Sequence, residues 1–298
     1  MTDRCSETGE LCGDLPLSAK ERRTYLAQGL RHIARSLAER HAVHAFRADR
    51  SSQEVRSKIR EGASPLRVYT CALAERIVPE YAATSGALCD LGCGGGEHRR
   101  FFRPAGTGRP WYVGVDVHPH AQWAMSAGDP GPMPCRFSQM SAQRLGFLSG
   151  SLGFTFSSSA LEHVPDVSLA AREMARAMRS DAYGLHIVPG VWALFLYWFH
   201  GYRRFSPGGL ASLFQEAGLE VVRVWALGGL ASFLLHGVWI SWLEQGVGST
   251  RWLRLHVGGR MRAGTMRNIY AWLLGLSLQL DRWIPVLPAG YGVLVRKP

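Results

Sequence analysis

From about residue 86 onward, short apolar runs alternate with stretches that are long enough to form helices. Seven such runs follow one another along the chain: ALCDL, WYVGVD, CRFSQ, FTFSSS, YGLHIV, LEVVRVW and YGVLVRKP. Strands that alternate with helices pair as a parallel sheet, because each helix carries the chain back to the end where the next strand begins. The sequence therefore predicts an α/β fold with a seven-stranded, mostly parallel sheet that has helices on both faces.

The chain is expected to carry additions on both sides of this pattern. Residues 1–60 form a predicted polar tail and a basic helical extension over 17–48, where leucine and isoleucine recur at helical spacing. Ser64 and Pro65 begin a second predicted helix that runs to about Tyr81. Residues 61–298 are predicted to form one large domain, with an apolar and basic helical insertion at about 225–285, before the last strand.

The insertion allows several interpretations. Residues 225–243 contain no charged side chain and are about long enough to cross a bilayer, which needs roughly 20 apolar residues. A single crossing would leave the last strand on the wrong side of the membrane, and 269–280 is too short to cross back. We therefore prefer a hairpin lying on a membrane or a lid over the substrate, with a self-packed subdomain or a dimer interface as the alternatives.

The charge of the chain favours anionic partners. The net charge is +11, and a basic stretch between the two apolar segments contributes Trp252 and the arginines Arg251, Arg254, Arg260, Arg262 and Arg267. Tryptophan beside arginine is typical of elements that face anionic headgroups, so 225–283 is a predicted contact with an anionic membrane surface. An ordinary solvated surface of an arginine-rich protein explains the same charge.

The cysteines and the N-terminus indicate a cytoplasmic protein. None of the six cysteines forms a CxxC pair, so neither a metal site nor a disulfide framework is predicted. The stretch MTDRCSETGE lacks the apolar run of a signal peptide. We expect a cytoplasmic location, with peripheral attachment to the inner face of the membrane as the alternative that the insertion suggests.

The first apolar run ends in a glycine-rich loop, ALCDLGCGGGEH, over residues 87–98. Glycines at a strand-to-helix turn let the backbone approach a ligand closely. Glu97 stands where a dinucleotide fingerprint has its third glycine, and no Gly-Lys-Ser/Thr of a phosphate-binding loop follows. These features disfavour phosphate ligands, whereas Asp90 suits a cofactor with positive charge, such as S-adenosylmethionine. Asp116 ends the next run, placed to accept hydrogen bonds from ribose hydroxyls.

Four segments together resemble a known family. ALCDLGCGGGEH, YVGVDVHP, FSSSALEHVPD and RRFSPGGLASLFQEAGLEVV are similar, in order and spacing, to class I S-adenosylmethionine-dependent methyltransferases with a type 11 domain. The likeness is to the broad group that includes the ubiquinone-biosynthesis O-methyltransferases, and it covers about residues 60–225 plus the last strand. It implies a Rossmann-like fold and S-adenosylmethionine as the cofactor.

The resemblance also implies a set of cofactor-binding residues. It assigns backbone contacts to Gly92 and Gly94, the amino-acid end of the cofactor to Asp90, and the ribose to Asp116, next to Val117. Ser157 and Ser158 match positions that line the methionine portion, and Arg67 in PLRVY matches an arginine that meets the cofactor carboxylate. Ser141 departs from the family, which has an acidic residue against the adenine at that position.

The methyl acceptor is less constrained. His163 in LEHVPD and His200 in WFHGYRRFSPGG are the candidate general bases, and a structural role in their loops is the alternative for each. Apolar stretches at 191–199 and in the insertion favour a small or lipid-linked acceptor, glycan-like or quinone-like, methylated on oxygen. A nucleic-acid acceptor is disfavoured because no Asn-Pro-Pro-Tyr-type motif follows the fourth run. A catalytically silent module that binds a membrane or a protein partner is the competing hypothesis, and the oligomeric state stays open.

Overall fold

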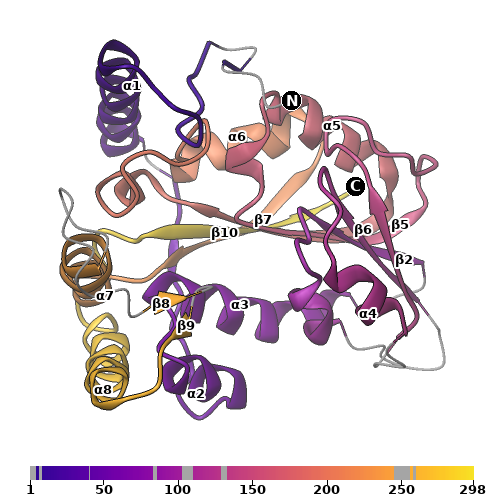
Figure 1. Cartoon of the computed structure of the whole chain (residues 1–298). Coiled ribbons are helices and arrows are strands. Elements are labelled where there is room, and N and C mark those ends of the chain that lie inside the picture. The colour runs from indigo at the N-terminus through magenta and orange to yellow at the C-terminus, as the bar shows by residue number, and fades with distance from the viewer. Residues whose placement is uncertain are drawn as a thin grey trace.

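The computed structural model of the chain describes residues 5–6, 9–39, 41–82, 86–102, 110–128, 133–244, 256–257 and 260–298. Its centre is an eight-stranded sheet with the order β1-β7-β10-β6-β5-β2-β3-β4 (Figure 1). The strands are β1 (His44–Ala45), β2 (Ala87–Leu91), β3 (Trp111–Asp116), β4 (Cys135–Gln139), β5 (Leu152–Ser158), β6 (Met178–Pro189), β7 (Glu220–Leu227) and β10 (Gly290–Arg296).

The sheet topology indicates where a ligand of such a fold usually binds. From β2 the chain proceeds outward to β3 and β4, and it then returns to the other side of β2 to form β5 and β6. All of these neighbours pair in parallel, and β10 alone runs antiparallel, between β6 and β7. Ligands of open α/β sheets bind where the strand order reverses, at the carboxyl ends of the strands. Here that point lies between β2 and β5.

The predicted α/β fold is confirmed, with one correction to the number of strands. The seven predicted strands all form, and β1 adds an eighth at the edge, where His44 and Ala45 pair in parallel with Trp225 and Ala226 of β7. Both residues of β1 are exposed. A two-residue edge strand with no buried side has no alternation of polar and apolar residues, so no pattern in the sequence could indicate it.

Helices cover both faces of the sheet (Figure 1). One face carries α2 (Gln53–Arg60) and α3 (Pro65–Tyr81), and the other carries α5 (Val167–Ala177) and α6 (Pro207–Glu216). A short helix, α4 (Gln122–Gly128), packs near β4. Side-chain caps begin two of these helices: the Ser64 hydroxyl accepts from the amide of Arg67, and the Asp166 carboxylate accepts from the amide of Leu169 at 2.8 Å.

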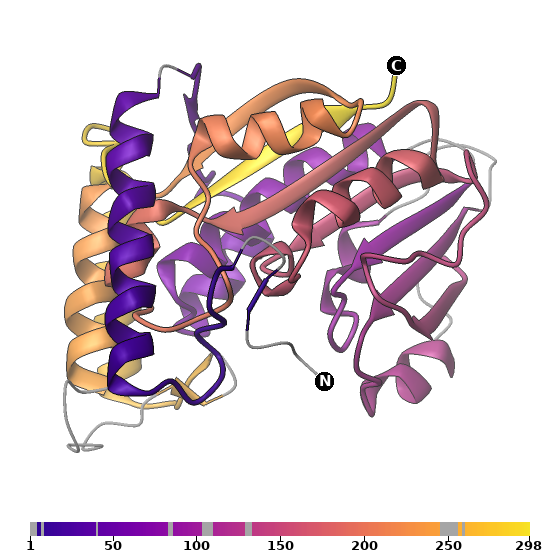
Figure 2. The ribbon, with the colours of Figure 1, turned by 90° about the horizontal axis from the view of Figure 1, so that it is seen from above.

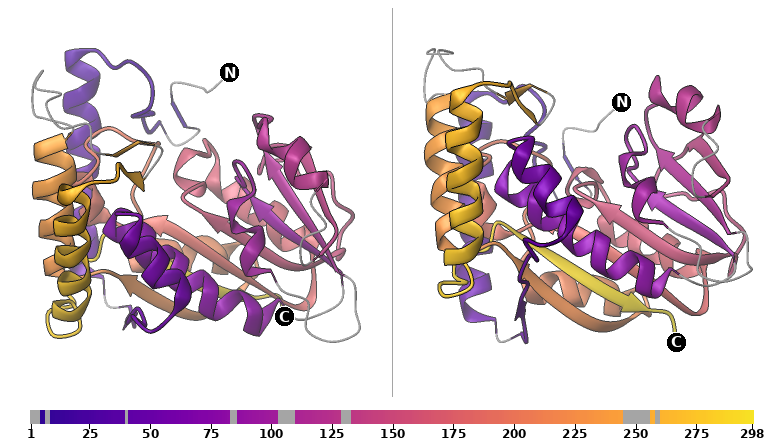
Figure 3. Two further views of the ribbon diagram at one scale, coloured as in Figure 1. Left: turned by 60° about the horizontal axis from the view of Figure 1, so that its bottom comes forward. Right: turned by 90° about the horizontal axis from the view of Figure 1, so that it is seen from below.

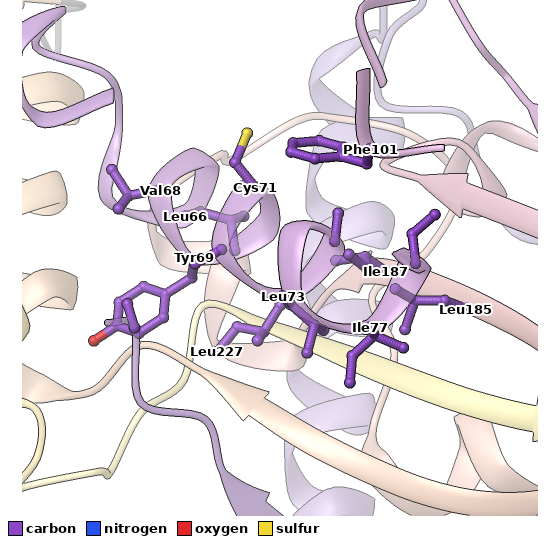
Figure 4. Close-up of a cluster of buried hydrophobic side chains, with 14 of the residues drawn as sticks. Leu66, Val68, Tyr69, Cys71, Leu73, Ile77, Phe101, Leu185, Ile187 and Leu227 are labelled. Carbon is purple, nitrogen blue, oxygen red and sulfur yellow. The ribbon is translucent and has the colours of Figure 1, made fainter. Parts of the chain in front are cut away.

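Helix α3 is buried on most of its circumference because it packs on the sheet, on α2 and on α7. Leu73 and Ile77 pack in one cluster with Leu185 and Ile187 of β6 (Figure 4). The Tyr69 hydroxyl donates to the buried carboxylate of Asp281 at 2.9 Å. These contacts fix α3 on the sheet, and the first turn of this helix reaches the carboxyl end of β2.

The insertion before the last strand is helical, as predicted. After β7 it contains α7 (Leu230–Leu235), the π-helix η4 (His236–Glu244), the short strands β8 (His256–Val257) and β9 (Arg260–Met261), and α8 (Thr265–Leu280). Helix α7 packs on α8, and α1 (Ala19–Ala38) stands at the same end of the sheet (Figures 2 and 3). Asp281 ties these parts together, because its Oδ1 also accepts from the amides of Ala231 and Ser232 at the start of α7.

The stretch 225–243 therefore differs from a single apolar helix. Its first residues, Trp225 to Leu227, complete β7, and α7 begins only at Leu230. Among the helices that the structure describes, none combines the length and the apolar character needed to cross a membrane. The transmembrane interpretation of 225–243 is thus not supported, and the predicted Arg251, Trp252 and Arg254 lie outside the described residues.

Candidate active site

A cavity of about 490 Å³ opens over the carboxyl end of β2. Its wall comes from the start of α3, the glycine-rich loop, the segment after β3 and the end of β5, and Tyr197 closes one side. Pockets of roughly 300–1,000 Å³ hold drug-sized or cofactor-sized molecules. This cavity is therefore large enough for a nucleoside-based cofactor at the point where the strand order reverses.

The glycine-rich loop forms the floor of the cavity, and Gly92 and Gly94 have different structural roles in it. Gly92 has φ +67°, and a Cβ there would lie 2.4 Å from the Cβ of Ala160. Gly94 has φ +52°, and a Cβ there would meet no atom within 4 Å. Gly92 is therefore required for packing against the segment after β5, whereas Gly94 leaves open space for a ligand.

The carboxylate of Asp116 holds this loop from the end of β3. Its Oδ2 accepts from the amide of Gly94 at 3.0 Å, and its Oδ1 accepts from the amide of His118 at 3.1 Å. The indole of Trp123 donates to the carbonyl of Gly94 at 2.7 Å, so both backbone groups of that glycine are anchored. Asp116 thus presents a charged acceptor beside Gly94, which lines the cavity.

Two predicted cofactor residues lie beneath the cavity rather than in its wall. Asp90 is fully buried, with one oxygen accepting from the Tyr112 hydroxyl at 2.6 Å and the other, Oδ1, without a hydrogen bond. Burial raises the pKa of Asp90 to about 7. Ser157 is also fully buried and bonds to Nδ1 of His186 at 2.9 Å. Burial lowers the pKa of His186 to about 3, so this ring is neutral at pH 7.

A charged pair stands at one side of the cavity. Arg67 and Glu97 both line it, and the guanidinium of Arg67 is hydrogen-bonded to the carboxylate of Glu97. Glu97, whose charge disfavours a pyrophosphate, is therefore paired with Arg67. The family resemblance places this arginine near the cofactor carboxylate. A carboxylate ligand for Arg67 would have to share it with Glu97 or displace that side chain.

The remaining predicted cofactor residues divide between the cavity and the surface. Ser158 lines the cavity together with Ser159. Val117 is half exposed, and its carbonyl accepts from the side-chain amide of Gln139 at 2.9 Å. Ser141 is exposed, and its hydroxyl accepts from the amide of Gln143 at 3.2 Å. Neither Val117 nor Ser141 is among the residues that line the cavity, and their assignment to the cofactor stays a prediction.

The two candidate bases meet outside this cavity. The imidazole rings of His163 and His200 lie 4.6 Å apart, and both hydrogen-bond through Nδ1 to the carboxylate of Asp14. Although burial acts to raise it, the hydrogen bonds from the two histidines hold the pKa of Asp14 well below its usual range. The ring of Tyr197, which lines the cavity, lies 5.8 Å from the ring of His200. The histidine pair therefore lies beyond Tyr197.

A second carboxylate faces the other side of the same rings. Glu162 is fully buried, and its Oε1 lies 3.8 Å from Nε2 of His163 and 4.0 Å from Nε2 of His200. Burial raises the pKa of Glu162. No pattern in the sequence indicated Asp14, because it lies 149 residues from His163 in a polar segment.

Comparisons with known proteins agree with the fold and identify one domain. Residues 89–185 match a family model described as a methyltransferase domain. Among curated proteins, none matches this sequence. The likeness to class I methyltransferases is thus confirmed for this segment, whereas the narrower likeness to ubiquinone-biosynthesis O-methyltransferases stays a prediction.

Two solved structures share the fold at low sequence identity. A chain from the complex of the Haloferax volcanii Trm112 methyltransferase activator with its methyltransferase is 16% identical, with a TM-score of 0.50, and the match covers 83% of this chain and 99% of that one. The cyclase SpnF is 15% identical, with a TM-score of 0.51, and the match covers 95% of this chain and 98% of that one. These likenesses concern the fold alone.

Proposed function

We propose that this chain, in which residues 89–185 form a methyltransferase domain, transfers a methyl group from S-adenosylmethionine to an oxygen of a small or lipid-linked molecule. The observation that carries the proposal is the cavity at the reversal of strand order, with its glycine floor and the Asp116 carboxylate beside it. The Rossmann-like fold, the family match and the absence of a phosphate-binding signature support the same cofactor.

The residues present fit this cofactor. Asp116 would accept hydrogen bonds from the ribose hydroxyls, the open space at Gly94 would admit the cofactor, and Arg67 would bind its carboxylate. The buried Oδ1 of Asp90 has no hydrogen bond, so this side of the loop retains an acceptor for a donor group. When bound, S-adenosylmethionine supplies a methyl group already activated by its sulfonium.

The protein has to align the acceptor with this methyl group and keep water away. Ser159, which directly follows β5, and Tyr197 both line the cavity, and an acceptor that enters beside them would meet the cofactor. An acceptor hydroxyl would have to lose its proton as it takes the methyl group, so a side chain or water beside it would have to receive that proton. A role for His163 or His200 in taking that proton stays a prediction, because both Nδ1 atoms are engaged by Asp14.

The proposal is tested by binding and by transfer. Calorimetry should show one S-adenosylmethionine site with a Kd in about the micromolar to millimolar range that is usual for enzyme substrates. Labelled methyl transfer into fractionated extract should then place the label in the lipid, glycan or small-molecule fraction. Label found only in RNA would contradict the proposed small or lipid-linked acceptor. An absence of S-adenosylmethionine binding would contradict the proposal that the protein is a methyltransferase.

A catalytically silent module remains the second candidate, because Ser141 departs from the family's acidic residue and neither His163 nor His200 lines the cavity. SpnF, which shares the fold, is a cyclase, and a fold alone does not decide chemistry. Binding of S-adenosylmethionine without transfer into any fraction would favour this second candidate over the enzyme.

We also propose that the insertion docks on an anionic membrane surface. Helix α8 exposes an apolar stripe at three- and four-residue spacing, and the chain that follows it exposes Trp283: the stripe contains Ile269, Trp272, Leu276 and Leu280. Trp272 is 67% and Trp283 84% exposed. Large unpartnered apolar surfaces mark interaction sites, and the exposed Arg262 and Arg282 beside this one favour anionic lipid.

Cosedimentation with vesicles of phosphatidylcholine and phosphatidylglycerol tests this proposal. The double variant Trp272→Ala, Trp283→Ala is expected to bind about tenfold or more weakly, because it removes the two most exposed aromatic rings of this surface. Trp111→Ala is the matched control, since Trp111 is also exposed but lies on β3. Equal binding of the double variant and the control, or no binding of the unmodified protein at low salt, would contradict the proposal.

A further inference from the structure

We propose that Asp14, His163 and His200 bind a divalent transition-metal ion, and that Glu162 orients the two imidazoles from the opposite side. Each of the three ligands offers one atom, and these atoms all lie within 4.8 Å of one another. Two imidazoles and one carboxylate are a donor set suited to ions such as Zn²⁺, Fe²⁺, Mn²⁺ or Co²⁺.

The distances from each imidazole to the Asp14 carboxylate are close to those between neighbouring ligands of a metal ion. Nδ1 of His163 lies 2.8 Å from Oδ2 of Asp14, and Nδ1 of His200 lies 3.2 Å from Oδ1. With metal–ligand bonds of about 2.1 Å, neighbouring ligand atoms are about 3.0 Å apart at a right angle and about 3.4 Å apart in a tetrahedron. Small movements of the side chains would therefore create the coordination.

A buried carboxylate on the other side of the two rings gives an independent reason for a metal. The Nε2 atoms of His163 and His200 both face Oε1 of Glu162. Both oxygens of Glu162 are buried without a hydrogen bond, and a buried carboxylate in that condition is costly. A metal bound at both Nδ1 atoms would leave an N–H at each Nε2, which can donate to Glu162.

This arrangement is the one that metal-binding histidines usually adopt. Their second nitrogen commonly donates to a carboxylate, which fixes the tautomer and the orientation of the ring. Glu162 lies 3.8 and 4.0 Å from the two Nε2 atoms, so a small closure of the loop would complete both hydrogen bonds. Glu162, which is fully buried without a hydrogen bond, and the three ligands on the other side of the rings therefore both indicate an ion at the same position.

The backbone assembles the site from three separate segments. The amide of Gly13 donates to the carbonyl of Gly201 at 2.7 Å, and the amide of Tyr202 donates to the carbonyl of Glu162 at 2.7 Å. The amide of Gly201 also donates to Oδ2 of Asp14 at 3.0 Å. These bonds hold the segments around residues 13, 162 and 201 together, so the ligands are preorganised.

The site is open on one side. The side chains of Asp14, His163 and His200 are 36–38% exposed, which leaves coordination positions for water or a further ligand. Because His200 lies next to Tyr197 at the cavity, an oxygen of the methyl acceptor can occupy such a position. This last step rests on the proposed function, whereas binding of the ion does not.

Titration of the chelator-treated full-length protein with Co²⁺ tests the site directly. The visible d–d absorption of Co²⁺ reports its coordination, and the exposed thiol of Cys5 is replaced in a Cys5→Ser background so that it does not compete. We expect saturation at one ion per chain. His163→Gln and His200→Gln should each weaken binding about 100-fold or more, and Glu162→Gln should weaken it about 10- to 100-fold.

His32→Gln is the matched control, because His32 also lies beside a single carboxylate, Glu10, at 3.5 Å and should leave Co²⁺ binding unchanged. Circular dichroism without metal checks that each variant folds. An absence of saturable absorption in the unmodified protein would overturn the proposal, as would unchanged affinity in both histidine variants. If the variants unfold, the unmodified protein still decides, since Zn²⁺ should then raise its Tm.

Chelation separates this inference from the proposed function. Removing the ion is expected to lower methyl transfer while S-adenosylmethionine binds with unchanged affinity. Co²⁺ binding without S-adenosylmethionine binding would retain the metal site and overturn the methyltransferase. Unchanged transfer by the chelated protein would overturn the role of the ion toward the acceptor.

Discussion

Replacement of Asp116 with alanine is expected to weaken S-adenosylmethionine binding about 100-fold or more. The change removes a charged acceptor for the ribose hydroxyls, and a hydrogen bond to a charged group contributes about 1.5–3 kcal/mol. It also frees the amide of Gly94, which Asp116 now holds at 3.0 Å in the floor of the cavity. A 100-fold change in Kd corresponds to about 2.8 kcal/mol, which is readily measured by calorimetry.

Two further variants make this result specific. Asp116→Asn keeps one oxygen acceptor but loses the charge, so it should fall between alanine and the unmodified protein. Ser141→Ala should bind within about threefold of the unmodified protein, because Ser141 is exposed and its hydroxyl accepts from the amide of Gln143 rather than from the glycine-rich loop. Unaltered affinity in Asp116→Ala would refute the assignment of this carboxylate to the ribose.

Replacement of Gly92 with alanine should lower the free energy of unfolding by about 3 kcal/mol. Its φ of +67° makes any side chain cost about 1–2 kcal/mol, and a Cβ 2.4 Å from that of Ala160 adds about 1–3 kcal/mol of overpacking. Gly94→Ala carries the same backbone penalty with no clash, since no atom lies within 4 Å of the added methyl group. This second variant should fold but lose cofactor binding, because its methyl group occupies the cavity.

Denaturant unfolding and calorimetry together separate the two effects. Gly150→Ala is the control for the backbone penalty alone, because Gly150 has φ +69°, an open environment and no place in the cavity wall. It should lose about as much stability as Gly94→Ala while retaining cofactor affinity. If the Gly92→Ala protein is as stable as the Gly150→Ala protein, the segment at Ala160 moves away from the added methyl group at little cost in free energy, and the predicted clash is wrong.

The features that the sequence predicted are those that local pattern determines. Alternating strands and helices, the start of a helix at Ser64 and Pro65, and the glycine-rich loop each depend on residues close together in the chain. Burial of Asp90 and Ser157 beneath the cavity depends instead on neighbouring strands, and motif spacing does not reveal which side of a strand end a ligand occupies.

The features that escaped prediction depend on long-range packing. The edge strand β1 exists because β7 offers an unpaired edge, and Asp14 reaches the two histidines through the fold of the N-terminal segment. The apolar stretch at 225–243 was ambiguous for the same reason. Its first residues are apolar because they are buried in the sheet, and exposed Trp242 lies in the same stretch.

The shared carboxylate of Asp281 connects two regions that otherwise have separate tasks. It accepts from Tyr69 of α3, one helical turn or less from Arg67 in the cavity wall, and from the first amides of α7 in the insertion. A force that pulls the insertion away from the sheet therefore acts on this buried acceptor and its three donors, as well as on the apolar contacts of Tyr270 and Leu274 in the core. If the proposed adhesion occurs at α8, Asp281 is one side chain through which it would act on the helix that reaches the cavity.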